Sequence, residues 1–517
     1  MIKELQLRVL PHIAHNDQQL LQEAAYQLSI PENEISGVRR KRQSVDARGK
    51  QVYYQIVAEV FINEPFEKFK IQNSKFKNIS SAEPVIIIGG GPAGIFAALK
   101  LIELGLKPIV IERGKDVSTR RRDLAALMKD KIVNSESNYC FGEGGAGTYS
   151  DGKLYTRATK RGDVERILQL FYSHGADERI LYEAHPHIGT NKLPQIITAM
   201  RQTILSCGGE FLFNSKVTQL LIEKDECKGV QLSNGEKIKG KAVILATGHS
   251  ARDIFSMLHE QKILIEAKPF ALGVRIEHPQ SLIDSIQYHC DNRGDYLPPA
   301  SYSLVHQVQG KGVFSFCMCP GGIIAPAMTN PGEIVVNGWS PSRRNNPFAN
   351  SGMVVSVDAE DFKPYEKYGA LSAMYFQQSV EQKCFVAGGS NLQAPAQRIT
   401  DFVNKKTSAS LPETSYFIGT SSINLWEVLP KSVTSRLQEG LIAFGKKMKG
   451  YYTEEGVLVA TESRTSSPVK IPRDKEILQH PQIKNLYPCG EGAGYAGGIV
   501  SAAMDGERCA VAVSQNH

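Results

Sequence analysis

The sequence predicts an α/β protein in which a parallel-sheet domain with a β-rich insertion is joined to a mixed α+β domain and preceded by a small α+β module. Three observations lead to this prediction. The β-branched run Val85–Ile88 passes through a glycine-rich turn into an amphipathic helix, which is typical of a strand buried in a parallel sheet. A second buried run, residues 241–248, follows a helix and several strand patterns. Residues 1–80 alternate as strand, helix, strand and strand.

Changes in composition place the domain boundaries. The small module covers residues 1–80, and the polar stretch 67–84 is interpreted as a linker because it contains few apolar side chains. The parallel-sheet domain is expected in two parts, residues 84–265 and 481–517. The mixed α+β domain, residues 266–480, is expected between them and is assigned to substrate binding.

Within the small module, Asn16 or Asp17 caps the expected helix. The two strands after this helix are joined by a polar turn, and the first of them carries the basic run Arg39–Arg42. Acidic residues nearly balance the basic ones across the module. The basic run is therefore interpreted as a solvated strand face rather than a nucleic-acid surface.

Composition describes a globular chain without a membrane-spanning segment. Hydrophobic residues make up 42% and charged residues 22% of the 517 residues, as in ordinary globular proteins. The 60 Lys and Arg residues exceed the 53 Asp and Glu residues too slightly to indicate a nucleic-acid partner. No run approaches the roughly 20 apolar residues that cross a bilayer. Nine scattered cysteines are expected to be mostly reduced thiols, so we expect a cytoplasmic location.

A glycine motif follows the first buried strand. Gly89, Gly91 and Gly94 have the G-x-G-x-x-G spacing. In this motif the first glycine permits a tight turn, the second lets a pyrophosphate approach the backbone, and the third lets the helix pack closely. Glu112 ends the next predicted strand, where a carboxylate accepts hydrogen bonds from a ribose 2′-hydroxyl. The complete order of strand, turn, helix, strand and acid predicts a Rossmann-type dinucleotide site.

A second match to the same spacing, formed by Gly142, Gly144 and Gly147, has no apolar strand before it and no helical run after it. We interpret it as a loop whose backbone amides face the far side of the same pyrophosphate, with Lys153 adding a positive charge. The alternative is a flexible connector.

A third match, which ends at Gly497, follows a strand and precedes a helix, but too few residues remain for a second dinucleotide unit. We therefore predict that its strand joins the first sheet. Glu491 would reach a ribityl or ribose hydroxyl, and the helix beginning near Gly498 would direct its positive end at an anionic ring. A reduced flavin carries negative charge near N1, so this arrangement favours a flavin.

The run 241–248 ends in Ala246-Thr247-Gly248 and follows a β-rich stretch that contains the turn Asn234-Gly235. One Rossmann sheet with a β-insertion before this strand, completed by a strand from the C-terminal region, is typical of FAD-binding oxidoreductases. We predict non-covalent FAD and no tightly bound NAD(P), because one complete dinucleotide unit is present. NAD(P)H is expected only as a transient electron donor.

Across most of its length the sequence resembles the bacterial family described as uncharacterised FAD-dependent dehydrogenases, or NAD(P)/FAD-dependent oxidoreductases, within the glutathione-reductase-like FAD superfamily. The resemblance implies a flavoenzyme but no particular substrate. Disulfide reductases of that superfamily carry a C-x4-C pair near the first domain and a second nucleotide-binding unit. The sequence has neither, which excludes their mechanism. The resemblance rests on the segments GEGGAGTYSDGKL, HIGTNKL, ATGHSARD, KPFALGVRIEHPQ, FCMCPGG, TESRTSSPV and GEGAGYAGGI.

The motifs and the resemblance together predict one set of cofactor contacts, most of them glycines and their neighbours. The set consists of Gly89, Gly91, Pro92, Ala93, Gly94, Glu112, Arg113, Gly144, Gly145, Ala146, Gly147, Thr148, Asp151, Lys153, Leu154, Val217, Ala246, Thr247, Gly248, Gly490, Glu491, Gly497, Gly498 and Ile499.

Four residues are candidates for catalysis. Cys317 and Cys319 are interpreted as core residues before a Pro-Gly-Gly turn. Their side chains are expected to point to opposite faces of a strand, so no disulfide or metal clamp is expected between them; the alternative is a thiol near the flavin. Arg464 would hold an anionic substrate group or form a loop salt bridge. His187, two residues after His185, is assigned to structural or substrate hydrogen bonding. We predict no metal, because no nearby ligand set completes a site.

The function expected from these observations is an FAD-dependent oxidoreductase that transfers hydride at flavin N5 with an unidentified small organic substrate. One alternative is an FAD-dependent nucleic-acid-modifying protein, which the balanced charge of the small module disfavours. A flavin monooxygenase or an isoprenoid-type reductase is a further alternative. The sequence predicts neither a membrane partner nor an oligomeric state.

Overall fold

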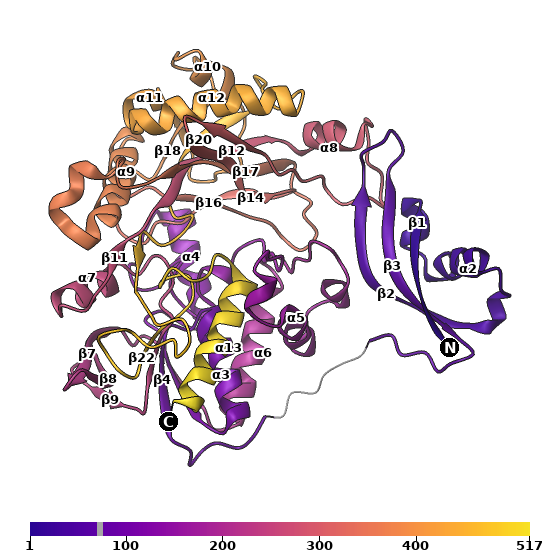
Figure 1. Cartoon of the computed structure of the whole chain (residues 1–517). Coiled ribbons are helices and arrows are strands. Elements are labelled where there is room, and N and C mark those ends of the chain that lie inside the picture. The colour runs from indigo at the N-terminus through magenta and orange to yellow at the C-terminus, as the bar shows by residue number, and fades with distance from the viewer. Residues whose placement is uncertain (70–75, 517) are drawn as a thin grey trace.

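A computed structural model describes residues 1–69 and 76–516 of the chain. Three units follow one another in Figure 1: a small module at the N-terminus, a parallel-sheet unit, and a larger antiparallel-sheet unit from which the chain returns to the parallel sheet. The linker predicted over 67–84 falls partly on residues 70–75, which lie outside the described residues.

The N-terminal module is a three-stranded antiparallel sheet with one long helix. Its strands, in the spatial order β1-β3-β2, are β1 (Ile2–Val9), β2 (Ile35–Asp46) and β3 (Tyr53–Ile62), and its helices are α1 (Pro11–Ala14) and α2 (Asp17–Leu28). The Asn16 side chain caps α2 by accepting a hydrogen bond from the Gln19 amide at 3.0 Å. In the basic run, Arg39 pairs with Glu59, and Arg40 pairs with Asp17 at 2.7 Å. These ion pairs partly neutralise the basic run.

A five-stranded parallel sheet forms the second unit. Its spatial order is β22-β10-β4-β5-β6, and its strands are β4 (Pro84–Ile88), β5 (Lys107–Ile111), β6 (Glu210–Leu212), β10 (Val243–Leu245) and β22 (Leu486–Pro488). The strand predicted before the third glycine match is thus the edge strand β22, next to β10, which the segment Ala246-Thr247-Gly248 follows. Side by side in Figure 1 lie α3 (Pro92–Leu104), α6 (Leu193–Ser206) and α13 (Ile499–Gln515).

Two glycines let α3 approach its neighbours closely. A Cβ at Gly94 would lie 2.0 Å from the carbonyl oxygen of Gly89, and a Cβ at Gly506 of α13 would lie 2.0 Å from the carbonyl oxygen of Ala93. No side chain fits at either distance. The glycine loop, α3 and α13 are therefore packed backbone to backbone.

The β-insertion and further helices complete this unit. The insertion is an antiparallel sheet of β7 (Val217–Glu223), β8 (Glu226–Leu232) and β9 (Lys237–Lys239), with Gly235 at φ +87° in the turn that the sequence predicts. The helices are α4 (Val117–Asp130), α5 (Val164–Ser173) and α7 (Arg252–Glu260).

The third unit is built on a seven-stranded sheet in the order β13-β14-β17-β12-β20-β18-β19. Its strands are β12 (Phe270–Pro279), β13 (Val305–Val308), β14 (Lys311–Cys319), β17 (Phe348–Val357), β18 (Ala394–Arg398), β19 (Thr420–Ser422) and β20 (Val457–Glu462). Smaller pairs are β11 (Glu266–Ala267) with β21 (Val469–Lys470), and β15 (Ile323–Pro326) with β16 (Val336–Trp339).

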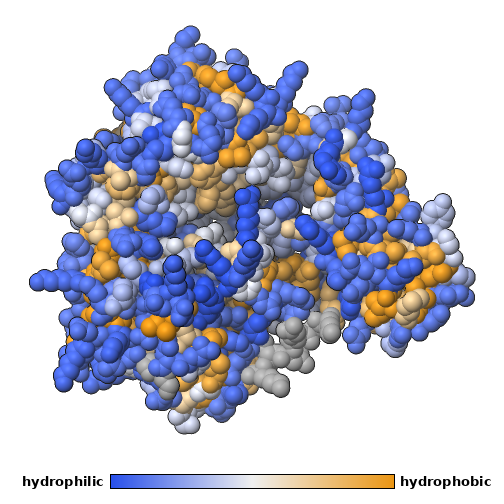
Figure 2. All heavy atoms as spheres, in the orientation of Figure 1, coloured by the Kyte–Doolittle hydropathy of each residue, from blue (hydrophilic) through white to orange (hydrophobic). Residues whose placement is uncertain are grey.

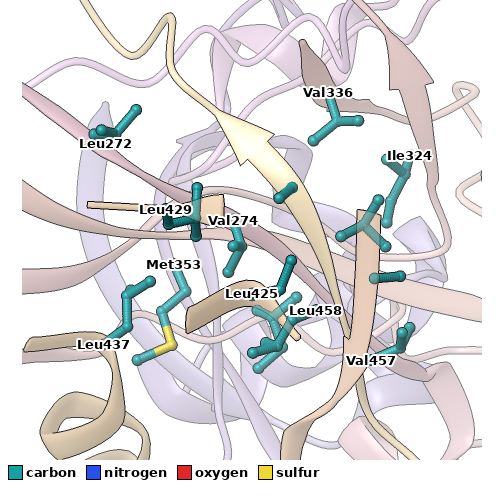
Figure 3. Close-up of a cluster of buried hydrophobic side chains, with 14 of the residues drawn as sticks. Leu272, Val274, Ile324, Val336, Met353, Leu425, Leu429, Leu437, Val457 and Leu458 are labelled. Atoms are coloured by element: carbon teal, nitrogen blue, oxygen red, sulfur yellow. The ribbon is translucent and has the colours of Figure 1, made fainter. Parts of the chain in front are cut away.

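Helices of the third unit bury the apolar face of this sheet. They are α8 (Gln280–Tyr288), α9 (Ser372–Ala387), α10 (Ile399–Val403), α11 (Leu425–Val428) and α12 (Lys431–Lys447). Figure 3 shows Leu437 of α12 beside Met353 of β17, in a cluster that also contains Leu272 and Val274 of β12. This core is separate from the two clusters that line the parallel sheet. Among the described residues, no helix has the length and apolar content to cross a bilayer.

The contact between α3 and α13 yields a stability prediction. Gly506→Ala forces a methyl group against the Ala93 carbonyl, so we expect the free energy of unfolding to fall by about 1–3 kcal/mol despite the better helix propensity of alanine. Chemical denaturation followed by circular dichroism measures this change. Gln515→Ala, on the exposed end of the same helix, serves as the control and should change stability little. A Gly506→Ala variant as stable as the parent would contradict the close packing.

Candidate functional site

A cavity of about 360 Å³ lies between the parallel-sheet unit and the antiparallel-sheet unit. Figure 2 shows hydrophilic side chains around the hollow between these two parts of the molecule. The walls come from the loops after β4, β5, β10 and β22 on one side and from the end of β14 on the other. Parallel sheets of this class place their ligands at the carboxyl ends of the strands, and this cavity occupies that position.

The first glycine loop forms one end of the cavity. Gly89 adopts φ +106°, and Gly91 precedes α3 without a capping side chain, so amides at the start of α3 lack a side-chain acceptor. A Cβ at Gly91 would have its nearest protein atom 3.8 Å away, in Gly145. The loop therefore presents bare backbone and the positive end of a helix dipole to the cavity.

Glu112 joins this loop to two others. One carboxylate oxygen accepts a hydrogen bond from the Gly90 amide at 2.8 Å, and the other accepts from the amides of Gly114 and Gly142, both at 2.9 Å. The residue is only 5% exposed and lines the cavity. The carboxylate predicted to bind a ribose thus also holds three loops in place.

The second glycine loop packs directly over the first. The Gly144 amide donates to the Gly90 carbonyl at 2.8 Å, and residues Gly145–Gly147 form a single 3-10 turn. Arg120, which is fully buried, donates to the carbonyls of Glu143 at 2.8 Å and Gly145 at 3.0 Å. This loop is therefore anchored, which argues against a flexible connector.

The C-terminal segment closes another side of the cavity. Glu491 and the start of α13, including Gly498, line it. A Cβ at Gly497 would meet no atom within 4 Å, so this position opens onto free space. Burial raises the pKa of Glu491 to about 7, and nearby Lys268 opposes this rise.

On the opposite side, Lys153 lies beside both cysteines of the Cys-Met-Cys segment. Its Nζ is 3.7 Å from the sulfur of Cys317, 3.7 Å from the sulfur of Cys319, and 3.6 Å from Asp151. Asp151 is buried, and Arg344 binds it through two nitrogens at 2.6 and 3.1 Å. The prediction that the two cysteine side chains point to opposite faces of the strand is wrong, because both sulfurs lie 3.7 Å from the same lysine nitrogen.

Arg464 belongs to a buried network of charges. Its guanidinium donates to Glu381 at 3.0 and 3.2 Å, to Glu333 at 3.1 Å and to Thr329 at 2.7 Å. Arg252 binds the same two glutamates at 2.8 and 3.0 Å. Burial alone would raise the pKa of Glu381, but the two arginines hold it below its usual value. Arg464 borders the cavity, yet its donors serve this network, which corresponds to the salt-bridge alternative.

The structure brings most predicted contact residues to the cavity. Those that line it are Gly89, Gly91, Pro92, Ala93, Glu112, Arg113, Gly145, Ala146, Gly147, Asp151, Lys153, Val217, Ala246, Thr247, Gly248, Glu491, Gly497, Gly498 and Ile499, together with the catalytic candidates Cys317 and Arg464.

Seven predicted residues do not line the cavity. They are Gly94, Gly144, Thr148, Leu154 and Gly490 of the cofactor set, and His187 and Cys319 of the catalytic set. Most of them have structural roles instead: the Thr148 hydroxyl donates to the Glu143 carbonyl at 2.8 Å, and the Gly490 amide donates to Asp505 at 2.8 Å. His187 bonds the Ser342 carbonyl at 3.1 Å, and burial lowers its pKa to about 4.

Sequence reasoning missed several lining residues. His249 follows directly after Gly248 and lines the cavity, so its place in the chain was a usable signal; burial lowers its pKa to about 4. Phe141 also lines the cavity and stacks under Arg113, whose guanidinium carbon is 4.2 Å from the ring centre. Other missed residues are Cys140, Ser150, Tyr155, Ser215, Lys216, Asp253, Phe316, Asn337 and Thr465.

One group of side chains has the composition of a metal site. Cys489, Asp505 and Cys509 are buried with ligand atoms within 4.8 Å of one another. However, Arg473 donates to Asp505 at 2.6 and 3.0 Å and lies 3.4 Å from the sulfur of Cys509. A guanidinium cation already balances this carboxylate, so the group does not suit a metal ion.

Comparison with known proteins identifies the family to which the chain belongs. Residues 83–268 match the family described as pyridine nucleotide-disulphide oxidoreductase, residues 269–465 match "FAD-dependent protein, C-terminal domain-like", and residues 1–61 match a domain of unknown function. An uncharacterized protein of Clostridium beijerinckii is 40% identical over 505 residues, which cover 93% of each chain. The chain belongs to an FAD-dependent oxidoreductase family.

More distant similarities are partial. The mitochondrial dihydrolipoyl dehydrogenase of Pisum sativum is 22% identical over 216 residues, which cover 42% of this chain and 38% of that protein. Among solved structures, the flavin-dependent brominase Bmp2 covers 84% of this chain and 79% of its own at 12% identity, with a TM-score of 0.37.

The residues of the cavity fit FAD, which is the cofactor of this family member. A dinucleotide needs bare backbone at its phosphates, a hydroxyl acceptor at its ribose and room for its ring. Gly91, Glu112 and Gly497 line the cavity at three such positions. The donor set contains no feature that is incompatible with a flavin dinucleotide.

Glu112 provides a test that separates structure from cofactor binding. In Glu112→Ala the three amides lose their charged acceptor, so we expect the free energy of unfolding of the apoprotein to fall by about 1–3 kcal/mol and FAD binding to weaken by a similar amount. Denaturant titration and flavin fluorescence measure the two effects.

The matched control for this test is Glu136→Ala. Glu136 bonds Arg113 and Lys216, and its side chain is 44% exposed, so we expect a change of under about 1 kcal/mol. Equal stability of Glu112→Ala and the parent protein would show that the carboxylate does not hold the loops.

Proposed function

We propose that the protein is an FAD-dependent dehydrogenase or reductase of the glutathione-reductase-like type, with a small organic substrate. The pyrophosphate of FAD would lie between the start of α3 and the loop Gly144–Gly147. Its ribose would lie at Glu112, and the isoalloxazine ring would lie between the start of α13 and the end of β14. Bound FAD supplies hydride acceptance and donation at its N5 atom.

One observation carries this proposal. The start of α13 and the end of β14, which belong to different units, line the same cavity and contribute Gly498 and Cys317 respectively. The unpaired amides at the start of α13 stabilise negative charge on a reduced ring. Across from them, Lys153 and the aromatic side chains of Phe316 and Tyr155 form a wall of mixed polarity, which suits a small organic substrate.

The residues around the ring position have distinct tasks. The Lys153 side chain carries a positive charge and lies beside Asp151. The ammonium group of Lys153 binds an anionic or polar group of the substrate at that wall. Glu491, whose pKa burial raises to about 7, exchanges a proton near neutral pH at its carboxylate oxygens. The packed glycine loops and α13 cover the cofactor and exclude water from it.

The alternatives have less support. Ion pairs with acidic residues engage Arg39, Arg40 and Lys41 in the basic run of the small module, which disfavours a nucleic-acid partner there. The described residues contain one strand–turn–helix–strand unit that ends in a carboxylate, β4 to Glu112, and we assign it to FAD. We therefore propose that NAD(P)H acts as a transient electron donor rather than as a resident cofactor.

An anaerobic screen tests the proposed reaction. The holoprotein is mixed with panels of organic hydride donors and with NADH and NADPH, and the visible absorption of the flavin is followed. We expect at least one donor to bleach the flavin without oxygen, and a matching acceptor to restore the colour. Product formation that requires oxygen and hydroxylates the substrate would instead identify a monooxygenase.

The position of the ring is tested at Gly497. This residue has no positive φ, and a Cβ there meets no protein atom, so Gly497→Val changes the cavity without straining the backbone. Gly498, at φ +156°, is a poorer choice because any side chain there is strained. We expect Gly497→Val to fold normally and to weaken FAD binding roughly tenfold or more.

The control is Ser514→Val at the far end of α13, which should bind FAD as the parent protein does. Dissociation constants from flavin fluorescence, together with apoprotein melting curves, report binding and folding separately. A folded Gly497→Val protein with unchanged FAD affinity and spectrum would place the ring elsewhere.

A further inference from the structure

The Cys-Met-Cys segment at the end of β14 has an irregular backbone. Pairing with β17 shifts register between Phe316 and Cys319. Cys317 adopts φ +46°, in the left-handed region that residues other than glycine rarely occupy. Backbone strain of this kind is concentrated at functional sites. The irregular backbone therefore makes the end of β14 a candidate for a functional site.

The two sulfur atoms lie together between two cations. Lys153 Nζ is 3.7 Å from each of them, and a guanidinium nitrogen of Arg275 is 3.7 Å from the sulfur of Cys319. The thiolate is the reactive form of cysteine, and neighbouring cations stabilise it. Two carboxylates accompany the cations: Asp151 is 3.6 Å from Lys153, and Glu462 binds Arg275 at 2.9 Å.

The two thiols have unequal roles in this arrangement. A hydrogen bond from Cys319 lowers the pKa of Cys317 well below its usual value, and Lys153 and Arg275 lower it further. The same hydrogen bond raises the pKa of Cys319. Of the two side chains, Cys317 is therefore the one that loses its proton more readily.

Access to the cavity also differs between them. Cys317 lines the cavity, whereas Cys319 is fully buried behind it. Gly498 and Ile499, at the start of α13, line the same cavity. The Cys317 side chain therefore faces the cofactor cavity, and the Cys319 thiol, which donates to the Cys317 carbonyl at 3.3 Å, lies directly behind it.

We propose that Cys317 and Cys319 form a reversible disulfide that exchanges two electrons with the bound FAD. In the oxidising direction the S–H bond of Cys319 breaks and one S–S bond forms between Cys319 and the Cys317 thiolate, and two electrons and one proton pass to the oxidised flavin, giving the anionic dihydroflavin. In the reverse direction the anionic dihydroflavin returns the two electrons and the proton, which restores the thiolate of Cys317 and the thiol of Cys319. The proposal depends on bound FAD but not on which organic substrate the proposed function uses.

Other cysteines of the described chain lack this combination. Cys489 and Cys509 are buried near each other but do not line the cavity. Cys140 lines the cavity, but its sulfur accepts a hydrogen bond from the Ser250 hydroxyl at 3.4 Å and forms none with a second cysteine of the described chain. The pair on β14 unites two neighbouring sulfurs, two cations and contact with the cavity.

Anaerobic titration with dithionite counts the electrons that the holoprotein accepts. The protein is first equilibrated with oxidised glutathione and desalted. We expect the wild type to take up twice as many electrons per flavin as Cys317→Ser or Cys319→Ser, because only the wild type has the disulfide as well as the flavin. Cys207→Ser, whose thiol lies outside the cavity, should match the wild type. Equal uptake by the wild type and both β14 variants would overturn the proposal.

A second readout needs no variant and therefore remains decisive if one fails to fold. Trypsin releases the peptide 312–343, whose only cysteines are Cys317 and Cys319. After acid quenching and alkylation, the oxidised holoprotein should give this peptide unalkylated and lighter by two hydrogens. Reduction with dithionite should restore both alkylation sites in the holoprotein, and it should do so much more slowly in the apoprotein. Two free thiols in the oxidised protein, or equal rates with and without FAD, would refute the exchange.

The failure of this proposal is distinguishable from failure of the proposed reaction. Dithionite titration reports the disulfide whether or not any organic donor bleaches the flavin. Conversely, a substrate that bleaches the flavin in Cys317→Ser would confirm the oxidoreductase and leave the disulfide to be decided by the electron count.

Discussion

The three hydrogen bonds accepted by the buried carboxylate of Glu112 are the interaction on which the cavity depends. Transferring a charge out of water is unfavourable unless hydrogen bonds replace the lost hydration, and three backbone amides from three loops do so here. The loop after β4 cannot move away from the loop at Gly142 without leaving this charge or these amides unsatisfied. The first loop leads into α3, and Arg120 anchors the second loop through the Gly145 carbonyl, so the two loops keep a fixed position relative to each other. This fixed position determines the shape of the cavity wall that the two loops form.

Local sequence signals predicted the parallel-sheet side of this site well. Strand, turn and helix are encoded within a few residues of one another, and glycines report where backbones must approach closely. The same signal did not distinguish the two uses of glycine: Gly91 faces the cavity, whereas Gly94 serves helix packing. Phe316 and Asn337 could not be predicted, because they reach the cavity only through the docking of two units far apart in the chain.

On the antiparallel-sheet side of the cavity, the sequence pattern does not reveal side-chain partners. The residues around Arg464 in the sequence do not indicate whether it binds a substrate or a glutamate, because its partners Glu333 and Glu381 come from distant segments of the chain. The positive φ at Cys317 was also invisible, since cysteine carries no preference for left-handed backbone as glycine does. These features arise from tertiary packing, which a single sequence records only indirectly.

The position of β22 at the edge of the parallel sheet has a consequence for synthesis on the ribosome. The strand next to it, β10, is translated before the whole antiparallel-sheet unit, and β22 is translated after it. A nascent chain therefore carries β10 with one side unpaired, and an open strand edge is a site of aggregation. It also lacks α13, so the cavity has no closing wall until the last helix has been made. Under the proposed function, FAD would therefore bind late in synthesis, after the exposed edge of β10 has been covered by β22.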